Sequence, residues 1–216
     1  ANTPYSAQNF FPKLGIEAHF VGPPIWEPET GFSHDEVSAF RQKCEINDDE
    51  VLVLTVCRKS PEKRYEAVAT SVERLRERGI PVRMIGVGAD ADQRPFEHAG
   101  CRWAGKLLGE DLQRAYAACD VFCLMSESES FGMVIPEAWH HGKPVVVNRR
   151  CGPAASLVAE GEDGLLAEPG LELDEALESL AADPEKRKSL GAKGHAKARE
   201  HYRRLSAAKR LLEAIS

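Results

Sequence analysis

Two carboxylates, Glu129 and Glu137, bracket a glycine in the segment Ser126-Glu-Ser-Glu-Ser-Phe-Gly-Met-Val-Ile-Pro-Glu137. Glu129 is expected in a loop, and Glu137 about one turn further on, at the start of a helix. This spacing across a loop-to-helix junction lets both carboxylates face one crevice. Gly132 has no side chain, so its amide can approach a ligand closely. The alternative is that Glu137 only stabilises the first helical turn, and that Glu127 and Glu129 are surface residues.

Two cations, Arg58 and Lys63, stand on either side of Pro61 in an earlier segment. They follow a continuous β-branched run, Val51–Val56, which predicts a strand buried on both faces. Cations between a strand end and a helix N-terminus form an anion site, because amide donors and the helix dipole add to them. Each charge-assisted hydrogen bond there contributes about 1.5–3 kcal/mol. The alternative is a solvated basic turn that also includes Lys59.

Strand and helix patterns alternate around these segments. Short apolar runs predict strands at residues 51–56, 82–86, 121–125, 144–147 and 165–167. Helices are expected from Pro61, over 110–118, around Pro136, and from the N-cap Asp183 onward. This alternation indicates an α/β fold with a Rossmann-like, doubly wound parallel sheet. We predict one domain over residues 1–216, in which residues 170–216 form a C-terminal helical extension.

The first 46 residues are less regular. Residues 19–21 are a candidate outer strand, and 22–28 form a loop rich in proline. The N-terminus shows no signal peptide, and no run approaches the roughly 18 apolar residues of a membrane span. The chain does not begin with Met, which suggests a fragment or a processed form.

Charge and cysteine usage narrow the class of protein. The formal net charge is −6 and the pI is near 5.7, which disfavours a nucleic-acid partner. The six cysteines form no CxxC pair and show no metal-ligand spacing with histidine. Reduced thiols in a cytoplasmic protein are therefore expected.

The carboxylate segment resembles a known signature. Glu129-x7-Glu137, followed by Ala138 and by Gly142–Val146, is similar to the signature of retaining GT-B glycosyltransferases of the glycosyltransferase group 1 family. The resemblance continues in the order typical of that family, from about residue 14 to the C-terminus.

Two further motifs support the resemblance. The segment Arg58–Lys63 resembles the family's GRLSPEKG motif, although Cys57 and Arg64 replace its glycines. Gly152-Pro153 and Gly161–Leu166 resemble the motif that follows the carboxylate segment.

The resemblance implies a donor site. The family has two Rossmann-like domains that face each other across a cleft, and this chain resembles the C-terminal, donor-binding domain without its N-terminal acceptor-binding partner. Arg58 and Lys63 would bind the diphosphate of a nucleotide diphosphate sugar. Glu129 would be the catalytic group that orients the transferred sugar, and Glu137 would hold the ribose hydroxyls. The amides of Phe131, Gly132 and Met133 would lie against the sugar or the phosphates.

The resemblance also implies a reaction. Sugar transfer would retain the anomeric configuration, by same-face departure and attack around an ion-pair-like state, without an established enzyme nucleophile. No metal and no cofactor are expected besides the nucleotide sugar. Ser156 stands where many relatives carry an acidic residue, and we assign no catalytic role to Trp139, His140 or His141.

Other patterns have simpler interpretations. Asp90-Ala-Asp92 is an Asp-x-Asp sequence of the kind that holds a divalent metal in another glycosyltransferase fold, but a polar loop is favoured. Gly86-Val-Gly88 is half of a dinucleotide fingerprint and is interpreted as a tight strand-end turn. The basic run 186–210 is a candidate for peripheral membrane contact, but its interspersed acidic residues favour a solvated helix face.

Two alternatives to a sugar-transferring enzyme domain stay open at this point. One is a nucleotide-binding module that does no chemistry. A nucleotide-sugar epimerase of similar architecture is a third hypothesis, which the context of Glu129 and Glu137 disfavours.

Overall fold

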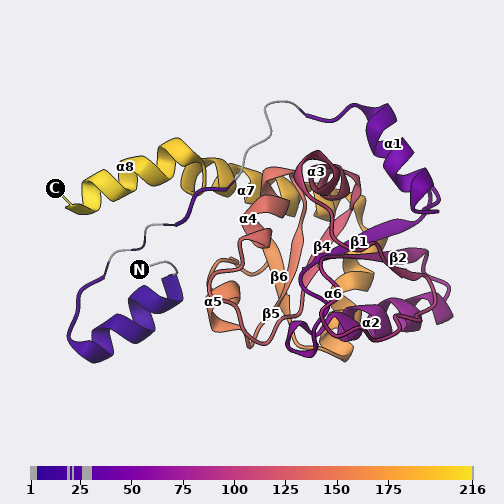
Figure 1. Cartoon of the computed structure of the whole chain (residues 1–216), viewed down its shortest axis with the longest axis horizontal. Helices are drawn as coiled ribbons and strands as arrows, with labels where there is room; N and C mark the ends of the chain where they lie inside the picture. The colour runs from indigo at the N-terminus through magenta and orange to yellow at the C-terminus, as the bar shows by residue number, and fades with distance from the viewer. Residues whose placement is uncertain (1–3, 19, 21, 26–30, 216) are drawn as a thin grey trace.

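A six-stranded, all-parallel sheet forms the centre of the molecule (Figure 1). The computed structural model describes residues 4–18, 20, 22–25 and 31–215. From one edge of the sheet to the other, the strands are β3 (Cys101–Trp103), β2 (Val82–Val87), β1 (Val51–Val56), β4 (Val121–Leu124), β5 (Val145–Asn148) and β6 (Gly164–Ala167). The predicted doubly wound α/β class is confirmed.

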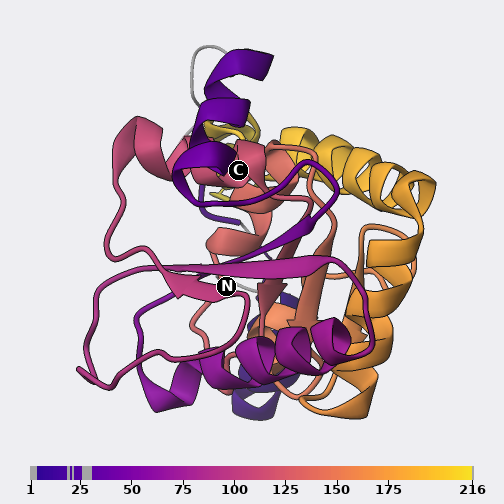
Figure 2. The same cartoon turned by 90° about the vertical axis from the view of Figure 1, so that its right-hand side faces the viewer.

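Helices connect the strands and cover both faces of the sheet. The helices are α1 (His34–Lys43), α2 (Tyr65–Glu77), α3 (Gly109–Ala118), α4 (Val134–His140), α5 (Gly152–Ala155), α6 (Leu171–Ala182), α7 (Pro184–His201) and α8 (Arg204–Ile215). Shorter helical turns are η1 (Ser6–Phe10), η2 (Phe11–Leu14) and η3 (Pro61–Lys63). Figure 2 shows α1 and α2 on opposite sides of the sheet.

The continuous β-branched run of β1 is explained by this double cover. Leu52 and Leu54 belong to the core on one face, together with Tyr116 of α3 and Trp139 of α4. Val51 and Val53 point into the core on the other face, with residues of α2 and α6. A strand buried on both sides has no polar face, so its sequence does not alternate.

The five strands and the principal helices that the sequence predicts are confirmed, with three omissions. The sequence patterns missed β3, α1 and α5. β3 has only three residues, with the exposed Arg102 in the middle. α1 is polar and has no buried residue, but its N-terminus carries a capping box between Ser33 and Glu36. That box is a sequence signal that identifies the start of this helix.

The helix expected from Pro61 begins later. Pro61 opens the short turn η3, and Arg64 then adopts a left-handed conformation with φ of 50° before α2 starts at Tyr65. In the N-terminal region, the candidate strand at 19–21 includes two residues outside the described part of the chain. Residues 26–28 of the predicted loop also lie outside it.

The C-terminal helices complete the cover of the sheet. Asp183 caps α7 as predicted, because its side chain accepts a hydrogen bond from the amide of Lys186 at 2.9 Å. α7 packs against α4, where Gly194 leaves room for the indole of Trp139. α8 then projects away from the sheet (Figure 1). Within the described residues, none of the helices has the length and apolar character needed to cross a membrane.

The turn after β2 depends on a glycine. Gly88 has φ of 147°, and a Cβ atom there would lie 1.7 Å from the carbonyl oxygen of Cys57. This close approach joins the ends of β1 and β2, and it explains the glycine as the tight strand-end turn expected from the sequence.

We predict that Gly88→Ala lowers the free energy of unfolding by about 2–3 kcal/mol, because the methyl group forces the ends of β1 and β2 apart. Urea unfolding measures the effect. Gly31→Ala is the control, since no atom of the residues that the structure describes lies within 4 Å of its Cβ position. A Gly88 variant as stable as the control contradicts the packing described.

A histidine ties the segment between β2 and β3 to α2. His98 Nδ1 lies 2.8 Å from a Glu73 oxygen, and its Nε2 lies 2.6 Å from a Glu66 oxygen. Burial opposes protonation of His98, but the two carboxylates outweigh it and raise the pKa of the imidazole. A raised pKa in the folded state stabilises the fold below the ordinary value near 6.5, and that contribution is lost as the pH rises through the folded-state pKa.

Between pH 6 and pH 9 we expect the native chain to lose about 0.5–1 kcal/mol more stability than His98→Gln, because the pairs are partly exposed. Unfolding free energies at both pH values measure the difference. His34→Gln, at an exposed position, should keep the native pH dependence. Equal pH dependence in the native chain and His98→Gln would show that the cluster does not titrate in this range.

Candidate functional site

The loops after β1 and β4 lie side by side because the two strands pair in parallel. Val53 pairs with Val121 and Leu54 with Phe122, so both strands end at the same edge of the sheet. The amide of Glu127 also donates to the carbonyl of Glu62 at 2.9 Å, which joins the second loop to the turn η3. The two segments that the sequence singled out therefore meet at the carboxyl edge, where open parallel sheets bind ligands.

Lys63 and Glu129 meet across this junction. The Lys63 ammonium donates to a Glu129 carboxylate oxygen at 2.7 Å, although the residues are 66 positions apart. The side chains are only 13% and 17% exposed, so water screens the pair little. Lys63 also reaches the carbonyl of Ser128 at 3.4 Å. The side chain predicted to bind the phosphates and the side chain predicted to orient the sugar thus form one ion pair.

Arg58 occupies the rim of the same region. Its guanidinium pairs with Glu62 at 3.2 Å, and its side chain is 67% exposed. Such an exposed pair contributes little to stability. The guanidinium can therefore turn toward an anion at low energetic cost.

A cleft of about 360 Å³ brings most of the predicted residues together. It is lined by Arg58, Lys63 and Glu129, by Phe131, Gly132 and Met133, and by Val56, Cys57, Ser130 and Val134. Gly132 has φ of 93°, a conformation that favours glycine, and it packs against Ala154 of α5. The lining combines two cations, one carboxylate and a run of backbone at the entrance to α4, groups suited to an anionic, hydroxylated ligand.

Glu137 lies one step away from this group. It is not among the described residues that line the cleft. It lies one turn of α4 after Val134, which does line the cleft. One oxygen of Glu137 accepts a hydrogen bond from the Tyr116 hydroxyl at 2.8 Å. Burial raises the pKa of Glu137, and the bond from Tyr116 partly opposes this shift. The sequence patterns did not single out Tyr116, although a buried tyrosine hydroxyl requires a partner.

A pair of salt bridges extends the carboxyl edge toward β6. Arg64 binds Glu127 through two nitrogens, and Arg150 pairs with Glu168. All four residues, together with Asn148, line a neighbouring hollow. Glu127 is exposed, as the alternative interpretation of the sequence expected, and the sequence patterns did not single out Arg150.

Both carboxylates of the Asp-x-Asp sequence form ion pairs with a lysine of the chain itself. The ammonium of Lys59, 2% exposed, lies 2.8 Å from Asp90 and 3.4 Å from Asp92. Tyr65 donates to Asp92 at 2.5 Å. The two carboxylates therefore hold the loop after β2 in place. Among the described residues, no group of three or more histidine, cysteine or acidic side chains is arranged to hold a metal ion.

The cysteines near the site are thiols, not thiolates. Burial raises the pKa of the Cys57 thiol to about 12, so it stays protonated at neutral pH. All six cysteines of the chain are unpaired. Cys57 therefore offers no charged nucleophile to the cleft.

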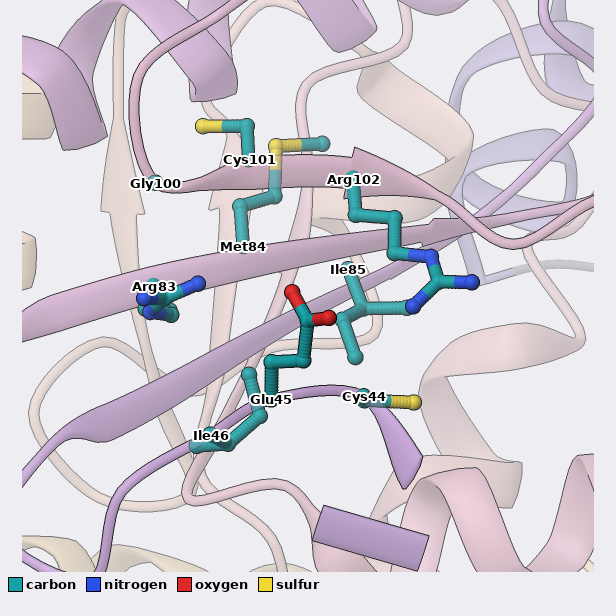
Figure 3. A pocket seen from close by; sticks show the side chains of 9 residues that line it. All are labelled: Cys44, Glu45, Ile46, Arg83, Met84, Ile85, Gly100, Cys101 and Arg102. Carbon is teal, nitrogen blue, oxygen red and sulfur yellow. The ribbon is translucent and has the colours of Figure 1, made fainter. Parts of the chain in front are cut away.

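A second cavity lies away from the predicted residues. It is bounded by the turn Cys44–Ile46 and by residues of β2 and β3 (Figure 3). Its arginines are held by the protein itself, since Arg83 pairs with Glu50 at 2.9 Å and Arg102 reaches the carbonyl of Lys43 at 3.4 Å. Its location beside the β2–β3 edge separates it from the carboxyl-edge loops.

The residues that received no role have structural partners. Trp139 is buried and donates to the carbonyl of Asp163 at 2.8 Å. His141 lies 2.6 Å from Gln113 and stacks on Tyr116, and the Ser156 hydroxyl donates to the carbonyl of Pro153 at 2.9 Å.

Two curated proteins of similar sequence are sugar transferases by name. The chain is 34% identical over 145 residues to sulfoquinovosyl transferase SQD2 of Arabidopsis thaliana, covering 65% of this chain and 28% of that protein. It is 31% identical over 182 residues to a D-inositol 3-phosphate glycosyltransferase of Kribbella flavida, covering 74% of this chain and 42% of the relative. The chain thus spans less than half the length of these two relatives.

Solved structures share the fold. The Anabaena protein Alr3699/HepE, crystallised with UDP and glucose, superposes with a TM-score of 0.83 at 22% identity, over 100% of this chain and 61% of its own. Sucrose-phosphate synthase of Thermosynechococcus elongatus gives 0.76 at 22% identity, over 100% and 58%.

The family model described as "Glycosyl transferases group 1" matches residues 36–197, three quarters of the chain. This match covers both the cation segment and the carboxylate segment of the site. The chain belongs to the group 1 glycosyl transferase family.

Proposed function

We propose that this chain is the donor-binding part of a retaining glycosyltransferase, which transfers a sugar from a nucleotide diphosphate sugar to an acceptor. The observation that carries the proposal is the convergence of Arg58, Lys63 and Glu129 on one cleft at the carboxyl edge of the sheet. The acceptor-binding part belongs to a further domain in this proposal.

The site suits the charge that develops when a nucleotide sugar breaks. As the bond between the sugar and the diphosphate is cleaved, negative charge grows on the leaving diphosphate. Lys63 and Arg58 stabilise that charge, and the cost of desolvating Lys63, which is mostly buried, is already met in the folded protein. Glu129 accepts hydrogen bonds from sugar hydroxyls, which orients the sugar. No metal is needed for this arrangement.

The ion pair between Lys63 and Glu129 opens when the donor binds. The diphosphate competes for the ammonium, and the sugar hydroxyls replace it as partners of the carboxylate. Both side chains are mostly buried, so neither is left in water while the exchange takes place. Lys63 thus exchanges one anionic partner for another, and Glu129 exchanges a cation for neutral hydroxyl donors.

The comparisons support the proposal at two points. Both curated relatives described above carry the name of a sugar transferase, and the Anabaena structure of the same fold was solved with UDP and glucose. The match to 61% of that structure also agrees with a chain that represents one of two domains.

Calorimetric titration with UDP, GDP, ADP and their nucleosides tests the proposal. We expect saturable binding of one diphosphate and much weaker binding of its nucleoside. Binding without transfer in a protein that also contains the acceptor domain would favour the module that does no chemistry. Absence of binding in that larger protein would contradict the donor site.

We predict that Lys63→Ala weakens binding of the nucleoside diphosphate about 10- to 100-fold, because one charge-assisted hydrogen bond to phosphate is lost. Affinity for the nucleoside should stay unchanged. Lys188→Ala, exposed on α7, is the matched control. Equal losses for diphosphate and nucleoside would mean that Lys63 does not meet the phosphates.

We predict that Glu137→Ala weakens nucleotide binding about tenfold, because the ribose hydroxyls lose their acceptor. Glu175→Ala, which removes an exposed carboxylate from α6, is the control. Unchanged affinity in Glu137→Ala, measured by the same titration, would remove this residue from the site.

A further inference from the structure

Glu137 is a half-buried carboxylate with a single side-chain partner. In the described part of the chain it forms no ion pair, and its side chain receives only the hydrogen bond from Tyr116, at 2.8 Å. An ionised carboxylate has about four acceptor positions, and burying one without a cation is costly. One oxygen of Glu137 is thus held by the protein, and most of its acceptor capacity stays available.

Tyr116 is built to hold that oxygen in one place. Its side chain is fully buried, and its ring stacks on His141 with 5.8 Å between centroids and an interplanar angle of 9°. The ring also contacts Phe122 of β4 at 5.9 Å. His141 is fixed in turn by a contact of 2.6 Å with Gln113. The phenol ring therefore has little freedom, and its hydroxyl is directed at Glu137.

The protonation states of this network suit a permanent donor. Burial and the Glu137 carboxylate both raise the pKa of Tyr116 well above its ordinary value, so the hydroxyl keeps its proton. Burial lowers the pKa of His141 to about 3, so the ring stacked on Tyr116 is neutral. The other titratable group that acts on Tyr116 is Cys119, and burial raises the pKa of its thiol to about 12, so it is uncharged at neutral pH.

We propose that Tyr116 is a positioning residue for the ribose: it fixes one oxygen of Glu137, so that the other faces the vicinal hydroxyls of a nucleotide. The inference rests on the proposed function and assigns a further residue to the same site. A carboxylate free to rotate binds a diol less well, because its orientation must be fixed when the ligand binds. Tyr116 fixes it beforehand.

The test compares a nucleoside diphosphate with its 2′-deoxy form. UDP, GDP and ADP are titrated first, and the tightest ligand is then compared with its 2′-deoxy analogue. In the native chain the ribonucleotide should bind about tenfold more tightly. In Tyr116→Phe this preference should fall toward unity, while affinity for the 2′-deoxy form changes little.

Tyr65→Phe is the matched control. It removes a hydroxyl that is buried to a similar degree and bonded to Asp92 at 2.5 Å. This variant should keep the native preference for ribose. Equal loss of preference in both variants would show a general effect of removing a buried hydroxyl and would overturn the inference.

The pH profile gives a second readout, which a merely structural role would not move. The bond from Tyr116 lowers the pKa of Glu137, so its loss should raise that pKa. The Glu137 carboxyl, followed by its carbon chemical shift in an NMR pH titration, should then titrate at a higher pH in Tyr116→Phe than in the native chain. In the native chain the ribose preference, which needs the ionised carboxylate, should be lost as the pH is lowered.

Glu137→Gln covers the case in which Tyr116→Phe does not fold. It should lose the ribose preference and the pH dependence together. A native chain that binds a diphosphate without preferring ribose overturns the role of Tyr116 but not the donor site. If the native chain binds none of the three diphosphates, the titration is repeated with the protein that also contains the acceptor domain, and absence of binding there overturns the proposed function.

Discussion

The parallel pairing of β1 with β4 is the constraint on which the site depends. Parallel strands end at the same edge of a sheet, so this pairing joins a loop at 57–64 to a loop at 125–133. Lys63 and Glu129 could not form an ion pair of 2.7 Å without it. The rest of the fold supports this junction, because α2 and α4 begin directly after the two loops and cover opposite faces of the sheet.

Departures from the family motif have local physical explanations. Arg64 stands where the resemblance places a glycine, and it keeps a left-handed conformation with φ of 50°. That conformation costs a non-glycine residue about 1–2 kcal/mol. The bonds from Arg64 to Glu127 offset part of this cost and join the start of α2 to the β4 loop. Cys57, at the other glycine position, lines the cleft as a neutral thiol.

Strands and helices could be predicted from the sequence where a run of neighbouring residues showed a clear apolar pattern. The run at 51–56 is continuous and β-branched, so a strand buried on both faces could be predicted from it, and the short apolar run at 144–147 predicted a further strand. β3 was missed because three residues with a central arginine give no pattern. Lys63 and Glu129 were both chosen for their chemistry, but their pairing across 66 residues depends on strand order, which no local pattern contains.

The same limit explains the contacts that sequence patterns did not find. Tyr116 appeared only as part of the predicted helix 110–118, and its bond to Glu137 needs the packing of α3 beside α4. The Asp-x-Asp sequence was interpreted as a polar loop, and the ammonium of Lys59 beside its two carboxylates could not be foreseen from the motif. In both cases the motif gave the residue type, and only tertiary packing gave its partner.

The most direct test of the account is an NMR titration of the amide-labelled chain with the nucleoside diphosphate that binds. A donor site in the cleft at the carboxyl edge predicts that the largest amide shifts occur at residues 57–64 and 129–133. The second cavity, at Cys44–Ile46 and Gly100–Arg102, should be unaffected (Figure 3). Shifts concentrated at that second cavity, with none near Lys63 and Glu129, would contradict it.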